Sequence, residues 1–172
     1  MTTANKITVF RIIMIPVFLI LAYTGHLIWA LAAFIVASLS DMADGYIARH
    51  YNQITDFGKF MDPLADKMLV LSAMCYFIER GQMPGWVVAI VLFREFAVSG
   101  LRLIAVEQNR VIAAAWSGKI KTAVTMVCLA VMLVFPQVRA INWTGGVLIL
   151  ITTVYSGVEY FMKNIDVFKG AK

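Results

Sequence analysis

Four aspartates at two short spacings are the residues of this chain that most clearly carry chemistry. Asp41 and Asp44 are three positions apart, and Asp62 and Asp66 are four positions apart. Either spacing places both carboxylates of a pair on one face of a helix. Because a short connection separates the pairs, we expect two antiparallel helices whose aspartates face each other. Such a site suits two divalent cations, Mg²⁺ or Mn²⁺, and paired metals support in-line displacement at phosphorus.

The depth of these aspartates argues against ordinary surface charge. If a helix begins at Leu27, its rise of about 1.5 Å per residue carries Asp41 about 21 Å along it, into the apolar layer of a membrane. A charge at mid-bilayer costs about 2.5–3.5 kcal/mol, and four carboxylates also repel one another. Solvated or salt-bridged acids at a helix end are the alternative. Four acids at one depth on adjacent helices favour bound cations instead.

The composition as a whole indicates a membrane protein. Of the 172 residues, 61% are hydrophobic and only 15% are charged, whereas a soluble domain carries about 25% charged residues. The net charge of +5 is explained by the basic bias of cytoplasmic loops, so no nucleic-acid partner is expected. Cys75 and Cys128 lie in apolar runs without metal-ligand spacing and are expected to be packing residues.

Six apolar runs predict an all-α, polytopic protein with six transmembrane helices, since each span needs about 20 apolar residues. The first run resembles a signal peptide but lacks a small-residue cleavage site, so we expect a retained helix. No repeat or long linker divides the chain, and residues 1–172 are expected to form one membrane-embedded domain. The predicted helices cover 7–24, 27–49, 61–79, 84–107, 114–135 and 143–163.

The basic residues predict the orientation in the membrane. Twelve Lys and Arg residues fall on one predicted side, and only Arg80 and Arg139 fall on the other. The positive-inside rule places the larger group in the cytoplasm, together with both termini and the aspartates. Trp29, Trp86 and Trp143 fall near the outer helix ends, as an aromatic belt would place them. The expected location is a bacterial cell membrane, crossed several times.

Small residues flank the aspartates. Gly45 and Ala48 follow the first pair, and Gly58 lies one turn before the second pair. Small side chains let a ligand or a backbone approach closely, but they also pack membrane helices together, and these residues alone leave both readings open. Arg49 fits either a phosphate contact or the positive-inside bias.

A second polar group lies in the predicted helix over 84–107. Arg94 and Glu95 fall near mid-membrane, where an ionisable pair indicates a functional site, with a structural brace as the alternative. Ser99 and Arg102 continue the same helix face toward the cytoplasmic side.

Two lysines enter the next predicted helix at the same side of the membrane. Lys119 and Lys121 are two positions apart, so we expect one to face a cavity and the other to face solvent or headgroups. For each lysine taken alone, the positive-inside bias is as good an explanation as a role in a binding site. A cluster of Arg and Lys suits a phosphate-bearing substrate, because Arg gives bidentate contacts, and Lys59 is a further candidate.

The aspartate region resembles the signature of the CDP-alcohol phosphotransferase family. The signature has eight fixed positions, and this chain agrees with all of them in the segments Asp41–Arg49 and Gly58–Asp66. Eight residues separate the two segments, and one of these, Asp56, is not a fixed position. The resemblance implies a six-helix, homodimeric membrane enzyme with its active site at the cytoplasmic interface. Such an enzyme displaces CMP from a CDP-linked lipid with an acceptor hydroxyl.

The resemblance also implies roles for the individual motif residues. The four aspartates would bind two metal ions, and Asp66 would also deprotonate the acceptor hydroxyl. Gly45, Ala48 and Arg49 would line the CMP pocket, and Gly58 would admit the nucleotide.

Further segments resemble the family members that use CDP-diacylglycerol and sn-glycerol 3-phosphate. Asn5, Thr8 and Arg11 match an N-x-x-T-x-x-R element, and residues 94–102 and 117–122 are similar to the same enzymes. This implies transfer of a phosphatidyl group to glycerol 3-phosphate in phospholipid biosynthesis, with Asn5 and Thr8 at the CDP-lipid. No residue of the predicted helix 143–163 is diagnostic. The residues expected at the glycerol phosphate are Arg11, Lys59, Arg94, Ser99, Arg102, Lys119 and Lys121.

Two other functions fit part of the pattern. The same chemistry with serine, inositol phosphate or phosphatidylglycerol as acceptor is one, although an uncharged or zwitterionic acceptor has less use for Arg102 and Lys119. A divalent-cation transporter is the other, since intramembrane carboxylates also mark ion pathways. A transporter is expected to spread its acids along a pore or to show inverted repeats. The acids here cluster at one depth, which favours the enzyme.

Overall fold

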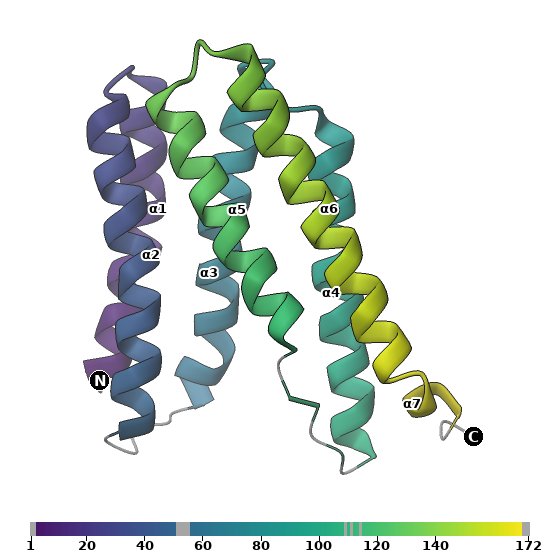
Figure 1. The fold of residues 1–172 in the computed structure, drawn as a ribbon. Helices are drawn as coiled ribbons and strands as arrows, with labels where there is room; N and C mark the ends of the chain where they lie inside the picture. Colours follow the sequence, from purple (N-terminus) through teal and green to yellow (C-terminus); the bar gives the residue numbers. More distant parts are fainter. Residues whose placement is uncertain (1–2, 51–55, 109, 111, 114, 170–172) are drawn as a thin grey trace.

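In a computed structural model (Figure 1), the described part of the chain folds into six long helices and one short helix. The structure describes residues 3–50, 56–108, 110, 112–113 and 115–169, and it leaves out the side chains of 3–4, 41–50, 56–60, 62–63 and 168–169. The helices are α1 (Thr3–Tyr23), α2 (Leu27–His50), α3 (Asp56–Glu79), α4 (Gly85–Glu107), α5 (Trp116–Val134), α6 (Arg139–Lys163) and α7 (Asp166–Lys169).

The predicted all-α fold is confirmed, with differences at helix ends. α3 begins at Asp56 rather than at 61, and α6 begins at Arg139 rather than at 143. Each added turn contains a charged residue, Asp56 and Lys59 in α3 and Arg139 in α6, so a prediction based on uninterrupted apolar runs omits these turns although their backbone is helical. α7 was not predicted, because four residues are too few for a periodic pattern.

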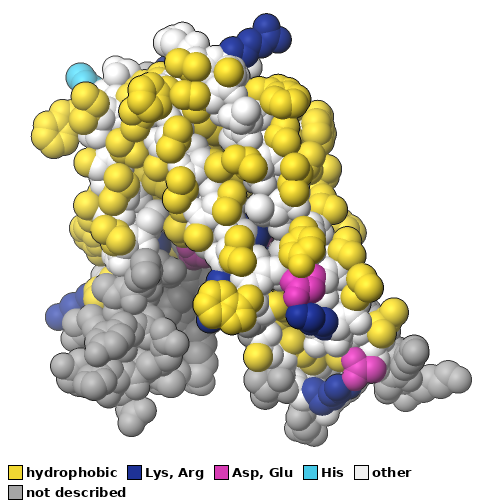
Figure 2. Space-filling model, in the orientation of Figure 1, with side chains coloured by type: hydrophobic (Ala, Val, Ile, Leu, Met, Phe, Trp, Pro, Cys, Tyr) yellow, Lys and Arg dark blue, Asp and Glu magenta, His cyan; other side chains and the backbone are white. Residues whose placement is uncertain are grey.

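The distribution of side chains is that of a membrane protein. Phe93 and Trp116 are 75% and 77% exposed on the outside, whereas Arg11 and Thr153 are fully buried at 0%. Figure 2 shows apolar side chains over the upper part of one face, with most of the described charges toward the lower end. By length and composition, α1, α5 and α6 can each cross a membrane. The chain is therefore a membrane-embedded helical protein.

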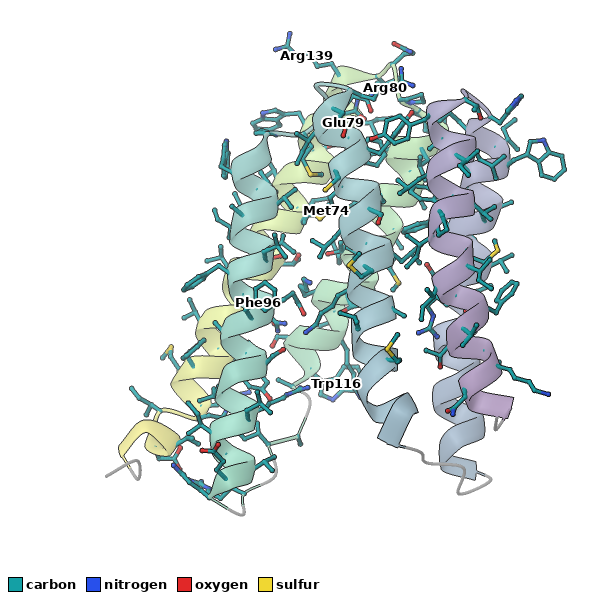
Figure 3. The ribbon with its side chains drawn as sticks, turned by 180° about the vertical axis from the view of Figure 1, so that it is seen from behind. Met74, Glu79, Arg80, Phe96, Trp116 and Arg139 are labelled. Atoms are coloured by element: carbon teal, nitrogen blue, oxygen red, sulfur yellow. The ribbon has the colours of Figure 1, made fainter. Side chains whose placement is uncertain are left out.

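The helices pack as two groups that diverge toward the lower end in Figure 1, with α5 between them. α1 packs on α2 and α3, while α6 packs on α4 and α5. The main apolar core includes Phe18, Phe34, Met74, Phe77 and Leu129. A smaller apolar cluster, around Leu101 and Tyr160, lies near the ends of α4 and α6. Polar side chains are also present in the lower half of the bundle, where Figure 3 shows them in the region below Met74.

Candidate active site

The aspartate motif lies on two contacting helices. Asp41 and Asp44 belong to the last turns of α2, and Asp62 and Asp66 to the first turns of α3. These turns lie at the lower end of the bundle (Figure 1). Of the four, Asp66 alone has a described side chain, and it is half-buried and makes contacts of its own. The predicted side chains that lie outside the described residues are Asp41, Asp44, Gly45, Ala48, Arg49, Gly58, Lys59 and Asp62.

A cavity of about 130 Å³ lies between α3, α4 and α5, beside this motif. Its walls are mostly apolar, with Val70, Leu92 and Phe96 among the lining residues. Its charged lining residues are Asp66, Lys67, Glu95 and Lys121. The structure therefore brings the last aspartate of the motif to the same cavity as charges from α4 and α5.

Glu95 is the centre of this charged cluster. Its Oε1 lies 2.8 Å from Lys121 Nζ and 3.0 Å from Arg94 Nη1, and its Oε2 lies 3.8 Å from Lys67 Nζ. The side chains of Lys121 and Glu95 are only 6% and 18% exposed. Three cations around one carboxylate leave a local charge of +2, which Asp66 offsets in part. A partly buried site with excess positive charge suits a phosphate-bearing ligand.

Lys67 joins α3 to α4 within this cluster. Its Nζ donates a hydrogen bond of 2.9 Å to Ser99 Oγ, besides facing Glu95. Ser99 was predicted at the site, whereas Lys67 is one of the twelve basic residues counted on the cytoplasmic side and was given no role at the site. Its place directly after Asp66, within an apolar helix, is the sequence signal that would have identified it.

The two lysines of α5 point in different directions. Lys121 is buried against Glu95, whereas Lys119 is exposed and its Nζ lies 5.0 Å from the centre of the Trp116 ring. Trp116 is itself on the outer surface. Lys121 is therefore the lysine of this pair that faces the cavity.

Arg94 is held by α6, which the sequence did not connect with the site. Its Nη2 donates a hydrogen bond of 2.6 Å to Ser156 Oγ. A Cβ added at Gly157 would lie 3.2 Å from Arg94 Cγ, and one at Gly118 would lie 3.4 Å from Nη2. These glycines leave the space through which the arginine side chain runs. The Ser156–Gly157 pair within an apolar helix was the available signal.

We expect Gly157→Ala to lower kcat several-fold, because the new methyl group must displace Arg94. Gly100→Ala is the matched control, since a Cβ there meets nothing within 4 Å. Both changes raise helix propensity by about 0.8–1 kcal/mol, so any difference between the two variants reports the shift of Arg94. Equal CMP release by the two variants would contradict a role for Arg94 placement.

Arg102 lies further along α4 and is anchored by α6. Its Nε donates a hydrogen bond of 2.7 Å to Tyr160 Oη, and its guanidinium carbon lies 5.4 Å from the centre of that ring. Tyr160 is buried. Within the described part of the chain no other hydrogen bond of Arg102 is present, so its two Nη groups are available to a ligand.

The N-terminal element forms a polar face of α1. Asn5, Thr8 and Arg11 are all buried, and each has polar or electrostatic contacts. Arg11 Nε donates a long hydrogen bond of 3.4 Å to Ser40 Oγ on α2. Ser40 directly precedes Asp41, so this face of α1 adjoins the start of the aspartate motif.

The short helix α7 closes the same end of the bundle. Arg110 Nη2 donates a hydrogen bond of 2.6 Å to Asp166 Oδ2. That hydrogen bond lowers the pKa of Asp166 below its ordinary value. The pair contributes stability above the unfolded-state pKa of the carboxyl group, and this contribution is lost as the pH falls through the lowered pKa. Both side chains are exposed, so the contribution is small.

Comparison with known proteins points to one family. Residues 1–156 match the family model described as CDP-alcohol phosphatidyltransferase. The chain is 38% identical to a CDP-diacylglycerol–glycerol-3-phosphate 3-phosphatidyltransferase of Bacillus subtilis (strain 168), over 96% of each chain. It is 36% identical to the Escherichia coli (strain K12) protein of that name, over 90% of each chain. It is 38% identical to a probable phosphatidylglycerophosphate synthase of Mycobacterium tuberculosis (strain CDC 1551 / Oshkosh), over 91% of this chain and 78% of the relative.

Proposed function

Since the chain belongs to the CDP-alcohol phosphatidyltransferase family, we infer that it transfers the phosphatidyl group of CDP-diacylglycerol to sn-glycerol 3-phosphate. The products are phosphatidylglycerophosphate and CMP. The observation that carries this inference is the similarity to enzymes of that name over at least 90% of the chain. The family prediction made from the aspartate motif is thereby confirmed.

The reaction exchanges one phosphorus–oxygen bond for another. The 1-hydroxyl oxygen of glycerol 3-phosphate attacks the β-phosphorus of CDP-diacylglycerol, and the bond from that phosphorus to CMP breaks. The hydroxyl proton must be removed as the new bond forms. We assign this task to Asp66, because its carboxylate lines the cavity that also contains Lys67, Glu95 and Lys121.

The donor set of the motif fits divalent cations. Two aspartate pairs at helical spacing on contacting helices offer only oxygen ligands, the type preferred by Mg²⁺ and Mn²⁺. We propose that Asp41, Asp44, Asp62 and Asp66 hold two such ions. When bound, the ions would neutralise the diphosphate and stabilise charge on the departing CMP oxygen. The predicted roles of Gly45, Ala48, Arg49 and Gly58 at the CMP group, and of Asn5 and Thr8 at the CDP-lipid, belong to the same proposal.

We propose that the acceptor phosphate binds at the charged cluster around Glu95. Lys121 and Lys67 are fixed by Glu95 and Ser99, and Arg94 by Ser156, so their orientation is set before the ligand arrives. Arg102, two turns beyond Arg94 on α4, offers its two Nη groups. Arg11, Lys59 and Lys119 were predicted here too. Lys119 lies against Trp116 on the outer surface, where it is better placed for lipid headgroups.

The cellular setting extends the proposal. The similar proteins named above are bacterial, so we place the enzyme in a bacterial cell membrane with the aspartates and both termini in the cytoplasm. The exposed apolar surface is surrounded by membrane lipid, and a homodimer is expected. Cysteine-accessibility labelling of engineered cysteines at the two bundle ends would test this orientation.

An acceptor panel tests the function directly. Purified protein in detergent, with labelled CDP-diacylglycerol and Mg²⁺ or Mn²⁺, should release CMP with glycerol 3-phosphate. Serine, inositol phosphate and phosphatidylglycerol should release little. Release with one of these acceptors and none with glycerol 3-phosphate would overturn the acceptor assignment. Omission of divalent cations or addition of a chelator should abolish turnover if the aspartates hold metal.

Arg102→Ala should mainly raise the apparent KM for glycerol 3-phosphate. Loss of a charge-assisted phosphate contact of about 1.5–3 kcal/mol predicts an increase of about 10- to 150-fold. Tyr160→Phe keeps the ring but removes the hydroxyl that accepts from Nε, so its effect should be smaller and in the same direction. An unchanged KM in Arg102→Ala would remove this residue from the acceptor site.

A further inference from the structure

A second and larger pocket lies at the other end of the bundle. It has a volume of about 660 Å³ and is formed where the connection from α3 to α4 meets the connection from α5 to α6. Both connections are at the upper end in Figure 1, away from the α2–α3 motif. Glu79, the last residue of α3, is 13 positions beyond Asp66, which is about 20 Å along a helix. The pocket is thus separate from the cavity described above.

Two arginines give this pocket its charge. Arg80 and Arg139 line it, and none of its lining residues, all of which are described, is Asp or Glu. Figure 3 shows both arginines at this end of the bundle. The Arg80 guanidinium carbon lies 5.4 Å from the centre of the Tyr76 ring, a cation–π contact that helps hold it. The net charge of +2 in the lining favours an anion.

Two helix N-termini add to the positive potential. α4 follows the N-cap residue Pro84 and α6 follows Val138, and neither cap makes a side-chain hydrogen bond. Neither helix has an acidic residue in its first turn. The first N–H groups of a helix lack partners within it and carry partial positive charge. Such ends bind phosphate groups, and here two of them border one pocket with two arginines.

The pocket is held in shape by a shared carbonyl group. Gln82 Nε2 and Asn142 Nδ2 donate hydrogen bonds of 2.7 Å and 2.9 Å to the backbone oxygen of Pro136. These bonds join the α3–α4 connection to the α5–α6 connection and to α6. A pocket fixed in this way loses little freedom when a ligand binds.

One wall of the pocket continues as an apolar strip along α6. Trp143, Val147 and Leu150 follow one another at helical spacing in the lining, and Trp86 faces them from α4. Both tryptophans are exposed, as is typical of side chains at a membrane interface. Gly146 also lines the pocket, and a Cβ there meets nothing within 4 Å, so open space lies next to it. A ligand with a phosphate and an acyl chain fits this combination, whereas a free phosphate would leave the apolar strip uncovered.

We propose that this pocket binds an anionic phospholipid from the membrane leaflet opposite the active site. The phosphate lies between Arg80 and Arg139 at the ends of α4 and α6, and an acyl chain lies along Val147 and Leu150. A lipid with a net negative headgroup is preferred over a zwitterionic one, since no acidic residue of the lining can receive a headgroup cation. This site takes no part in the transfer reaction.

Lipid binding to the delipidated full-length protein in detergent tests the proposal by native mass spectrometry. The probes are phosphatidylglycerol and phosphatidylcholine with the same acyl chains. The double variant Arg80→Gln/Arg139→Gln should bind phosphatidylglycerol about 10-fold or more weakly, because two charge-assisted phosphate contacts are lost. Its CMP release should stay within about twofold of the original chain. The matched control, Arg110→Gln/Lys163→Gln, removes two exposed positive charges at the other end of the bundle and should bind the lipid normally.

A second variant keeps the test independent of the arginines. Gly146→Leu extends a side chain into the pocket from a position where a Cβ meets nothing within 4 Å. It leaves both charges in place, so it should weaken phosphatidylglycerol binding as well. Unchanged binding in both the double variant and Gly146→Leu would overturn the proposal. Equal binding of phosphatidylcholine would overturn the charge preference. Competition by millimolar inorganic phosphate that removes the bound lipid completely would show a free-anion site instead.

Discussion

Asp66→Asn should lower kcat for CMP release by about 10²–10⁴-fold, the range for loss of a general base. Asparagine has nearly the same shape as aspartate, so the helix and the cavity should remain intact. It cannot take the proton of the acceptor hydroxyl, and it is a weaker ligand for a divalent cation. Because Asp66 is assigned to both tasks, the fall in kcat should exceed any change in the KM for glycerol 3-phosphate. Steady-state kinetics with labelled CDP-diacylglycerol measures both.

Asp56→Asn is the control for this experiment. Asp56 begins the same helix and has the same side chain, but it stands outside the fixed positions of the motif. Its variant should retain activity within about threefold, as expected for a residue at a helix end without a role in the motif. Turnover by Asp66→Asn at the original rate would remove Asp66 as the base.

Glu95→Gln should destabilise the protein by about 3–5 kcal/mol, the cost of leaving buried charges without their partner. Lys121, Arg94 and Lys67 all face this carboxylate, and glutamine leaves their charges uncompensated. Activity should fall as well, because the orientation of Lys121 and Lys67 depends on Glu95. Thermal or denaturant unfolding in detergent measures the first effect, and the KM for glycerol 3-phosphate reports the second.

A double-mutant cycle separates this effect from a general packing defect. Lys121→Gln removes one of the excess cations, so Glu95→Gln/Lys121→Gln should be less destabilised than the sum of the two single variants. The exposed pair Glu159–Lys163 offers a contrast on α6. Glu159→Gln should leave the unfolding transition almost unchanged, since exposed ion pairs contribute little. Strict additivity in the cycle would contradict the central role of Glu95.

The sequence predicted the helices well because apolar runs of about 20 residues have few other interpretations in a membrane. The predicted helix ends were wrong where a helix extends beyond its apolar run. The first turn of α3 contains Asp56 and Lys59, and α6 begins at Arg139. These turns are helical because the backbone hydrogen bonds continue past the apolar layer, a condition that hydropathy does not detect.

The candidate site was predicted as far as local spacing reaches. The position of Arg94 and Glu95 within an apolar helix marked them as a functional pair, and the i,i+2 spacing of Lys119 and Lys121 predicts that only one of these lysines points inward. The partners that other helices supply to these residues could not be predicted from spacing within one helix. Ser156 meets Arg94 and Tyr160 meets Arg102 only because α6 packs across α4, and this contact joins residues about 60 positions apart in the sequence.

The bridge between α3 and α4 has a consequence for how the protein enters the membrane. α1, α5 and α6 are apolar enough to partition singly, whereas α3 and α4 carry the charged side chains Lys67 and Glu95. Each of these charges costs about 2.5–3.5 kcal/mol if its helix leaves the translocon alone. The tight turn at Gly81, with its φ of 67°, makes the two helices a hairpin in which Lys67 and Glu95 meet. Release of α3 and α4 together therefore favours biogenesis, so that the ion pair of the candidate site also assists insertion.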